Sequence, residues 1–324
     1  MARILFHGTA VVASKLKGTD NMCSQVTVIV NAMAGSEAIG LELVKTLEGP
    51  FRSAGVAVEI ILAQTGEAIR EAVLRAIRSN PRAVVAGGGD GTINAVAALL
   101  VDTDIAFGIL PLGTLNHFAK DLKIPLDLDA AVRNVIVGRT VKVDVGEVNG
   151  RFFVNNSSLG IYPRIVRDRD QQQRSGRRKW VAFFWAVLAV LRRHSFLNVR
   201  LVVDGEEHIR RTPFVFVGNN EYEMEGFNIG TRSCLNASQL SAYTVRHERR
   251  GGLLMLALRA LFGRLRQSKG FDVFCAREII VESKHRHLYV AIDGEVTMMN
   301  TPLRYQVRPA SLRVIVPGCI ECAP

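Results

Sequence analysis

The chain has 324 residues, enough for two domains that each bury a core of their own. Its 41 Lys and Arg residues outnumber 30 Asp and Glu, and the net charge of +11 favours phosphates, nucleic acid or an anionic membrane as partners without choosing among them. Five scattered cysteines argue against a disulfide scaffold. Residues 1–24 lack a signal-peptide core, and the longest apolar stretch, residues 180–191, falls short of the roughly 20 residues that span a bilayer. We therefore expect a cytoplasmic protein.

The first part of the chain predicts an α/β domain. Residues 1–24 carry little strand-like or helical pattern, and we expect a disordered extension there. From residue 25 to 138, short β-branched runs alternate with helical segments, which predicts a mostly parallel sheet covered on both faces. The expected strands are residues 26–30, 56–62, 83–86 and 105–110, and the expected helices are residues 36–51, 67–77, 92–100 and 127–137.

The pattern changes after Gly138 to paired strands. Asn149 and Gly150 are typical of a tight hairpin turn, and residues 139–317 predict an antiparallel lobe whose last segment is a candidate to return to the first lobe. Residues 318–324 are expected to be a tail. Two helical insertions are expected, over residues 161–194 and 252–262. The expected strands are residues 140–147, 152–155, 197–203, 213–218, 240–246, 278–282, 288–292 and 312–316.

A glycine-rich loop follows the buried strand at residues 83–86. It reads Gly87-Gly-Gly-Asp-Gly-Thr92 and leads into a helix. Glycines let the backbone approach a ligand, and the helix N-terminus offers N–H groups and a positive dipole end to phosphate oxygens. Asp90 would repel a phosphate unless it serves a cation or a proton transfer. The alternative, an ordinary turn with Asp as N-cap, explains one or two of the glycines but not four around an acid.

A second loop ends the next predicted strand. Residues 108–116 place Gly113 and Thr114 directly before another helical segment. In an open parallel sheet both loops lie at the carboxyl ends of strands, where ligands bind. Neither loop has the spacing of a Walker A or dinucleotide motif. The pair predicts one phosphate-binding crevice.

Three motifs together resemble the diacylglycerol-kinase-type family of bacterial lipid kinases, which is related to eukaryotic diacylglycerol and sphingosine kinases. They are Gly-Gly-Asp-Gly-Thr at 88–92, Leu-Pro-Leu-Gly-Thr-Leu-Asn at 110–116 and Ala-Ile-Asp-Gly-Glu at 291–295, in that order. The resemblance runs from about residue 26 to 317. It implies an ATP-dependent lipid kinase with a nucleotide-binding α/β lobe and an antiparallel β-sandwich lobe. It assigns nucleotide binding to Asn31, Gly35, Thr65, Gly88, Gly89, Asp90, Gly91, Thr92, Ile93, Asn94 and Thr114.

The same resemblance names the candidate catalytic acids. It implies that Glu295 accepts the proton of the acceptor hydroxyl, with Asp293 close by and Asp90 in the phosphate loop. It also implies that Asp144 helps to hold the catalytic Mg²⁺ through water. From the residues alone, residues 293–295 are equally typical of an Asp-Gly hairpin turn, and Asp144 of a polar strand residue.

Two segments depart from the family pattern. The family's Asn-Pro-x-Ser-Gly is here Asn-Ala-Met-Ala-Gly at residues 31–35, which loses a rigid turn and a hydroxyl. Many bacterial members hold a structural Mg²⁺ with an Asp-Asp-Gly-x-Leu segment, whereas residues 236–240 read Asn-Ala-Ser-Gln-Leu. Ala237 stands where the carboxylate belongs, so we expect no structural magnesium site.

The basic and aromatic segment in the middle of the chain gives information about the binding partners of the protein. Residues 164–179 carry seven Lys or Arg and two Asp, and the apolar residues 180–191 follow. This pattern favours peripheral binding to an anionic membrane, while a core helix with solvated ends is an equal alternative. We expect a lipid substrate and no specific nucleic acid. A soluble acceptor such as NAD, or a non-catalytic nucleotide or lipid binder, stays open, and the sequence specifies neither the lipid nor the oligomeric state.

Overall fold

The computed structural model describes residues 5–7, 10–15, 25–32, 37–160, 196–225, 228–232, 234–245 and 271–318. The chain divides into two compact units, of which the first comprises Met1–Val143 with Ala310–Pro324 and the second Asp144–Pro309. This division lies close to the boundary predicted at residue 138. The helical insertions expected over residues 161–194 and 252–262 lie outside the described residues, as does most of the tail.

The sheet of the first unit has the strand order β1-β2-β4-β3-β5-β6-β20. Its four central strands run parallel, and the final part of β20 joins them through the pair Val314 and Phe107. The strands are β1 (Leu5–His7), β2 (Ala10–Lys15), β3 (Val26–Asn31), β4 (Val58–Ala63), β5 (Ala83–Gly88), β6 (Ala106–Pro111) and β20 (Leu303–Val316).

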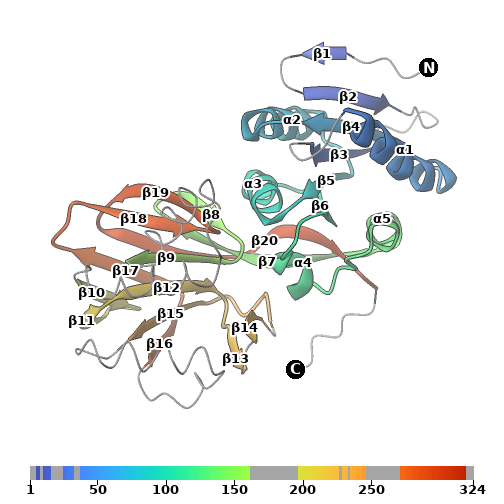
Figure 1. Ribbon diagram of the computed structural model, residues 1–324. Coiled ribbons are helices and arrows are strands. Elements are labelled where there is room, and N and C mark those ends of the chain that lie inside the picture. The colour runs from blue at the N-terminus through green and yellow to red at the C-terminus, as the bar shows by residue number, and fades with distance from the viewer. Residues whose placement is uncertain are drawn as a thin grey trace, which may run out of the picture. The chain divides into compact units, whose positions relative to one another are not determined.

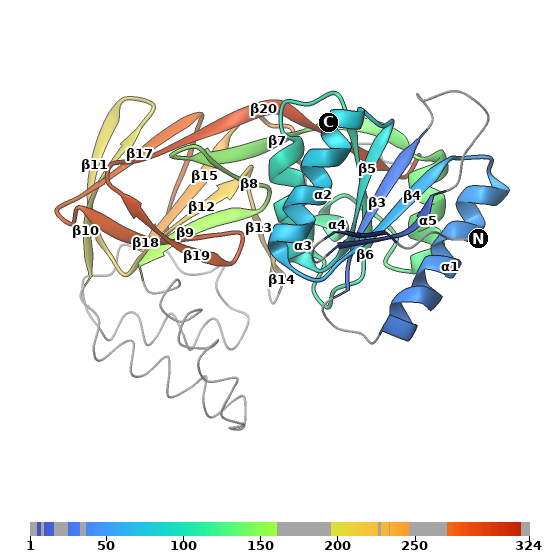
Figure 2. The same cartoon turned by 90° about the horizontal axis from the view of Figure 1, so that it is seen from above.

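Helices cover both faces of this sheet (Figures 1 and 2). One face packs against α1 and α5, where Phe51, Val28 and Val85 belong to one buried cluster. The opposite face packs against α2 and α3. The helices are α1 (Glu37–Ser53), α2 (Gly66–Ser79), α3 (Asp90–Leu100), α4 (His117–Asp121) and α5 (Leu128–Val137). The predicted α/β arrangement is therefore confirmed.

The expected disordered extension is wrong for residues 5–7 and 10–15. These residues form the hairpin of β1 and β2, and β2 pairs antiparallel with β4. This hairpin has two physical causes, the strand propensity of its own residues and the open edge of the sheet. Val11 and Val12 favour extended backbone, and β4 would otherwise present a row of unpaired backbone groups at the edge of the sheet.

The second unit is a sandwich of two antiparallel sheets. One contains β17 (Glu278–Ser283), β10 (Leu197–Val203), β11 (Glu206–Thr212), the first part of β20, β7 (Arg139–Val148) and β8 (Arg151–Phe153). The other has the order β16-β15-β12-β9-β18-β19, and β13 with β14 forms a separate hairpin. These strands are β16 (Phe271–Ala276), β15 (Leu240–Val245), β12 (Phe214–Asn219), β9 (Asn156–Gly160), β18 (His287–Ile292), β19 (Glu295–Asn300), β13 (Glu223–Glu225) and β14 (Asn228–Thr231).

The core of the sandwich lies between the facing sheets. Leu201 and Tyr305 from one sheet share a buried cluster with Val217 and Val290 from the other. The buried hydroxyl of Tyr305 lies 3.1 Å from that of Ser157 on β9, so a polar bond also joins the sheets. The predicted antiparallel β-sandwich is confirmed.

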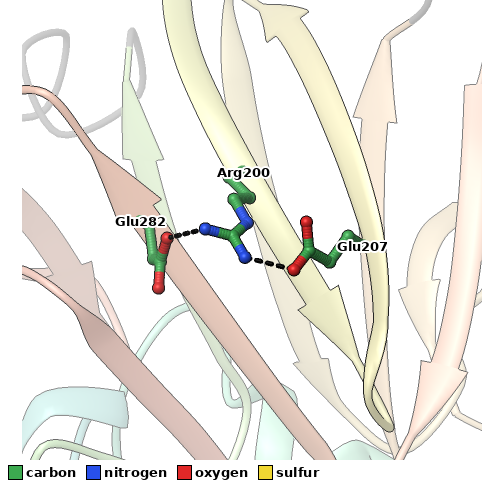
Figure 3. A network of polar contacts seen from close by, with 3 residues as sticks. All are labelled: Arg200, Glu207 and Glu282. Atoms are coloured by element: carbon green, nitrogen blue, oxygen red, sulfur yellow. Dashed lines mark hydrogen bonds and ion pairs between the residues drawn. The ribbon is translucent and has the colours of Figure 1, made fainter.

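Strand β11 was not predicted, because its sequence, Glu-Glu-His-Ile-Arg-Arg-Thr, has little apolar alternation. It lies at the edge of its sheet, where charges are tolerated and discourage pairing with other chains. Arg200 on β10 forms ion pairs with Glu207 on β11 and, at 3.2 Å, with Glu282 on β17 (Figure 3). Such exposed pairs contribute little to stability, so the strand depends on its backbone ladder.

No helix among the residues that the structure describes is long and apolar enough to cross a membrane.

Candidate functional site

The first half of the candidate site lies at the carboxyl edge of the parallel sheet. Gly87 of β5 pairs with Val30 of β3, and Gly88 pairs with Pro111 of β6, so these strands end at the same level. The chain leaves β3 toward β4 and then returns to β5 on the other side of β3. Strands β3 and β5 therefore flank a topological switch point, the place where open α/β sheets bind ligands.

The glycine-rich loop is tied to the end of β3. Asn31 donates its side-chain N–H to Oγ1 of Thr92 over 2.9 Å, across the switch point. A Cβ on Gly88 would lie 2.7 Å from Cβ of Thr92, so this close approach requires glycine. Helix α3 begins after Gly89, which has no side chain to cap it. The start of α3 thus presents backbone N–H groups that a phosphate can bind.

The second loop lies directly against the first. A Cβ built on Gly113 would lie 2.5 Å from Cα of Gly89, closer than real side chains come. Asp90 joins the loops chemically, because its Oδ2 accepts the N–H of Asn116 at 3.0 Å and its Oδ1 accepts that of His117 at 2.8 Å. The side chain is therefore not an N-cap of its own helix, which was the alternative weighed from sequence. It binds the start of α4 instead.

The remaining predicted nucleotide residues occupy different environments. Thr65 caps α2, where its Oγ1 accepts the N–H of Ala68 at 3.1 Å, and the residue is exposed. Thr114 is exposed in the second loop, whereas Asn94 is buried. Ile93 is fully buried and its N–H is bonded to Gly89, so it contributes to the core of the first unit. Gly35 lies outside the described residues.

In the second unit, Asp293 occupies the two-residue turn between β18 and β19. Its φ of 47° and the 90° of Gly294 give the hairpin turn that Asp-Gly favours. The carboxylate accepts three backbone N–H groups, from Val154 to Oδ2 and from Asn155 and Asn156 to Oδ1, all at 2.9 Å. Loss of hydration raises the pKa of Asp293 to about 6, although these amides oppose the rise. Asp293 thus holds the segment where the chain passes from β8 to β9.

Arg232 holds the same segment from its carbonyl side, and sequence reasoning missed it. The guanidinium is buried, and its Nη1 donates to the carbonyls of Val154 at 2.6 Å and Asn219 at 3.0 Å. Its Nη2 donates to the side chain of Asn155 at 3.0 Å. Its charge also lowers the pKa of Asp293, in opposition to burial. In the sequence, Arg232 is a single arginine in a segment without a recognisable motif, so little marked it as important.

The Asp-Gly-Glu tripeptide of residues 293–295 occurs a second time, at residues 204–206 between β10 and β11. There Oδ1 of Asp204 accepts the N–H groups of Arg277 and Glu278, each at 3.2 Å. In both hairpins, then, the aspartate bonds to the backbone of a neighbouring segment. Residues 293–295 differ in that Asp293 is half-buried, whereas Asp204 is exposed, and in the segment that the carboxylate holds.

Glu295 is the other acid of this hairpin. It is exposed at the first position of β19, where it pairs with Ile292. Unlike Asp293, its side chain extends from the exposed end of a hairpin. An exposed carboxylate of this kind is available to accept a proton from a bound hydroxyl.

Asp144 is buried and bonds to the loop at residues 235–239. Its Oδ2 accepts the N–H of Ser238 at 2.7 Å, and its own N–H donates to the carbonyl of Leu235 at 2.9 Å. Asn220 supports the same loop by accepting the N–H of Ala237 at 3.1 Å. The loop at residues 235–239 is thus tied to the sandwich by protein hydrogen bonds.

These features define a class: an α/β domain with two glycine loops at the carboxyl edge of its sheet, followed by a β-sandwich domain. Two family models match the chain, the diacylglycerol kinase catalytic domain over residues 25–148 and the YegS C-terminal NAD kinase beta sandwich-like domain over residues 158–316. The chain belongs to the diacylglycerol-kinase-type family that these two domains define.

Curated relatives match part of the chain. A protein of Klebsiella pneumoniae (strain 342) named "Probable lipid kinase YegS-like" is 38% identical over 148 residues, which cover 44% of this chain and 48% of the relative. A protein of the same name from Yersinia pestis (strain Pestoides F) is 44% identical over 90 residues, or 26% of this chain and 30% of the relative. The match to the Klebsiella protein spans about half of that relative's length.

Solved structures match the whole fold. A crystal structure of a diacylglycerol kinase from Bacillus anthracis str. Sterne superposes with a TM-score of 0.65 at 20% identity, over 90% of this chain and 97% of its own. A second crystal structure from that organism has a TM-score of 0.68 at 21% identity and the same coverage. At this level of identity the likeness establishes the fold alone.

Proposed function

We propose that the chain is a kinase that transfers the γ-phosphate of ATP to a hydroxyl group of a lipid. The observation that carries this proposal is the pair of glycine loops in contact at the switch point, in a chain of the diacylglycerol-kinase-type family. The names of the curated relatives support a lipid as the acceptor.

The first unit would bind the nucleotide. Gly88 and Gly113 lie in such close contacts that a Cβ at either would disrupt the loops, whereas Gly91 is exposed with open space around it. Backbone can therefore approach phosphate oxygens at Gly91 and at the start of α3. The hydrogen bond from Asn31 to Thr92 ties the end of β3 to the start of α3, next to the backbone N–H groups there. These residues fit the phosphates of a nucleotide.

Magnesium would arrive as part of the substrate, MgATP. Bound to the phosphates, it neutralises part of the charge that develops during phosphoryl transfer. Among the described residues, no three His, Cys, Asp or Glu side chains are grouped as a resident metal site requires. Mg²⁺ commonly binds through substrate phosphates, water and one or two carboxylates, so such a group is not needed. The role of Asp144 toward magnesium through water stays a prediction.

The second unit would supply the proton acceptor. In the transfer, the acceptor oxygen bonds to the γ-phosphorus, the bond from that phosphorus to the β,γ-bridging oxygen breaks, and ADP leaves. The hydroxyl proton passes to a carboxylate, for which we propose Glu295 because it is exposed. The carboxylate of Asp293 accepts hydrogen bonds from three backbone N–H groups. We propose that these bonds hold the turn that carries Glu295.

A soluble acceptor is the second candidate, and one observation favours it. The family model that matches residues 158–316 is described as NAD kinase beta sandwich-like, and NAD carries hydroxyl groups. A non-catalytic binder of nucleotide or anionic lipid is the third candidate, based on the altered residues 31–35 and on Ala237.

One assay separates the three candidates. The full chain is incubated with γ-labelled ATP and Mg²⁺ and either a total bacterial lipid extract in mixed micelles or NAD. A lipid kinase places the label in the organic phase, and mass spectrometry then identifies the lipid. Label on NAD alone would replace the lipid proposal by the second candidate. ATP binding without transfer to either acceptor would favour the third.

A further inference from the structure

Asp90 connects two loops that lie far apart in sequence. It is the first residue of α3, and both of its carboxylate oxygens accept N–H groups at the start of α4, from Asn116 and His117. A carboxylate that accepts two successive N–H groups at a helix start acts as a cap. Here the cap comes from a residue 26 positions earlier in the chain.

Hydrogen bonds within the second loop hold it in one conformation. The side chain of Asn116 accepts the N–H of Gly113 at 3.1 Å and donates to the carbonyls of Gly113 at 2.8 Å and Pro111 at 3.3 Å. The N–H of Leu112 donates to the carbonyl of Gly88 at 3.0 Å. The loop is therefore anchored to β5 at its beginning and to Asp90 at its end.

The two anchors fix how closely the loops approach. Gly113 faces Gly89 so tightly that an added Cβ would lie 2.5 Å from Cα of Gly89 and 2.8 Å from Oδ1 of Asn116. Without the bonds from Asp90 to the start of α4, two links between the loops would remain. They are the hydrogen bond from Leu112 to Gly88 and the contact between Gly113 and Gly89. The bonds of the Asp90 carboxylate thus lie next to the closest approach of the two glycine loops.

We propose that Asp90 is a positioning residue, which sets the residue 112–117 loop against the residue 88–91 loop and so gives the phosphate cradle its shape. The inference rests on the proposed nucleotide binding and refines it. It differs from the role expected from sequence, in which Asp90 serves the metal or the proton transfer. A positioning residue affects nucleotide affinity whether or not magnesium is present, whereas a metal-binding acid affects only the magnesium complex.

The first test needs no nucleotide. Hydrogen exchange of the full chain is compared between wild type and Asp90→Ala. We expect exchange in peptides covering residues 112–121 to become faster by about tenfold or more, since the bonds to a charged acceptor are lost. Asp90→Asn keeps one oxygen as acceptor, so its effect should be smaller. Unchanged exchange over residues 112–121 would overturn the proposal.

The second test measures affinity for ADP by calorimetry, once with Mg²⁺ and once with a chelator. Asp90→Ala should weaken binding by a similar factor, about tenfold or more, in both conditions. Gly113→Ala is the steric counterpart, because it forces the same two loops apart without removing a charge, and it should show the same pattern. A loss confined to the magnesium condition would assign Asp90 to the metal and overturn the proposal.

A matched control is available in the same unit. Asp127 caps α5 by accepting the N–H of Ala130 at 2.9 Å, so Asp127→Ala removes the same kind of bond elsewhere. Its effect on exchange should stay within the first turn of α5, and ADP affinity should not change. If Asp90→Ala does not fold, Asp90→Asn and Gly113→Ala carry both tests. Absence of ADP binding by wild type would contradict the proposed function, and the exchange experiment would still decide whether Asp90 positions the loop.

Discussion

At the scale of single residues, the acids of this chain differ in what their carboxylates contact. Asp90 and Asp293 accept backbone N–H groups through both oxygens, whereas Glu295 is exposed. Aspartate suits the first task because its short side chain bonds to nearby backbone at caps and turns. Glutamate at residue 295 leaves a carboxylate free of the hairpin backbone. In the proposed mechanism, the two aspartates position backbone and the glutamate accepts the proton.

The pKa of Asp293 gives a pH-dependent prediction. Burial raises this pKa from 3.8 to about 6, so the folded state binds the proton more tightly than the unfolded state. The stability that Asp293 contributes is therefore fully present below about pH 3.8 and is lost as the pH rises through about 6. Relative to Asp293→Asn, the free energy of unfolding of wild type should fall between pH 4 and 7 by on the order of 3 kcal/mol.

Urea unfolding of both proteins at several pH values measures this difference. Asp204→Asn serves as the control, since it makes the same substitution in the matching hairpin. A difference between wild type and Asp293→Asn that does not change with pH would contradict the assignment.

Glu295→Gln should abolish most of the transfer activity without loss of stability. General acid–base groups typically contribute about 10²- to 10⁴-fold, so kcat should fall by at least about 100-fold. The side chain is exposed and glutamine keeps its size, so the melting temperature should not change. Glu206→Gln, in the second Asp-Gly-Glu hairpin, is the matched control and should retain full activity. Comparable kcat values for wild type and Glu295→Gln would exclude Glu295 as the proton acceptor.

At the scale of elements, the loop at residues 235–239 illustrates how a segment can be held by protein groups. An asparagine such as Asn236 commonly bonds to the backbone of its own turn. The structure instead ties the loop through Asp144 and Asn220, while Oδ1 of Asn236 accepts the thiol of Cys234 at 2.8 Å. The bonds come from β7 and from the end of β12, which are distant in sequence.

We predict that chelation does not destabilise the nucleotide-free protein. A loop cation needs formal negative charge to offset its dehydration, and residues 236–239 supply none. A chelator should therefore leave the melting temperature unchanged within about 1 °C, whereas Asp144→Ala should lower it by several degrees with or without Mg²⁺. If chelation lowers the melting temperature by several degrees and Mg²⁺ restores it, this loop does bind a metal.

The passage from β8 to β9 is a second case at this scale. One continuous strand was predicted over residues 152–155, but β8 ends at Phe153 and β9 begins at Asn156 in the other sheet. The chain changes sheet here, and its amides and carbonyls are satisfied by Asp293 and Arg232 instead of by a ladder. A corner of this kind needs buried polar partners because no neighbouring strand supplies them.

At the scale of the whole molecule, the net charge of +11 and the basic segment at residues 164–179 predict binding to anionic vesicles. Replacing Arg177, Arg178 and Lys179 by Gln should weaken binding to anionic vesicles but not to neutral ones. Salt should weaken binding in part, because charges are screened over about 8 Å at physiological ionic strength while apolar contacts are not.

The control removes the same charge elsewhere, with Arg277, Lys284 and Arg286 changed to Gln, all of them exposed. Sedimentation with vesicles of stated anionic lipid content measures both variants. Equal binding of wild type to neutral and anionic vesicles would contradict the prediction.

The sequence by itself determined the class of fold and the position of the loops. Alternating strands and helices in the first unit, and paired strands around Asn149 and Gly150 in the second, are local patterns that one segment carries alone. The glycine loops were also visible, because glycine is required where backbone approaches backbone at Gly88 and Gly113. The hairpin of β1 and β2 was missed, since its pairing with the edge strand β4 is a tertiary event.

Only the tertiary structure decided what the acids contact. Asp90 bonds to amides 26 and 27 positions away, and Asp293 to amides 137 to 139 positions away. Every residue except proline has a backbone N–H, so an amide that receives such a bond leaves no mark in the sequence. Arg232 escaped notice for the same reason, because its partners are mainly backbone carbonyls. The sequence therefore specified which chemical groups are present. The packing of distant segments decided which carboxylates bond to backbone and which stay exposed.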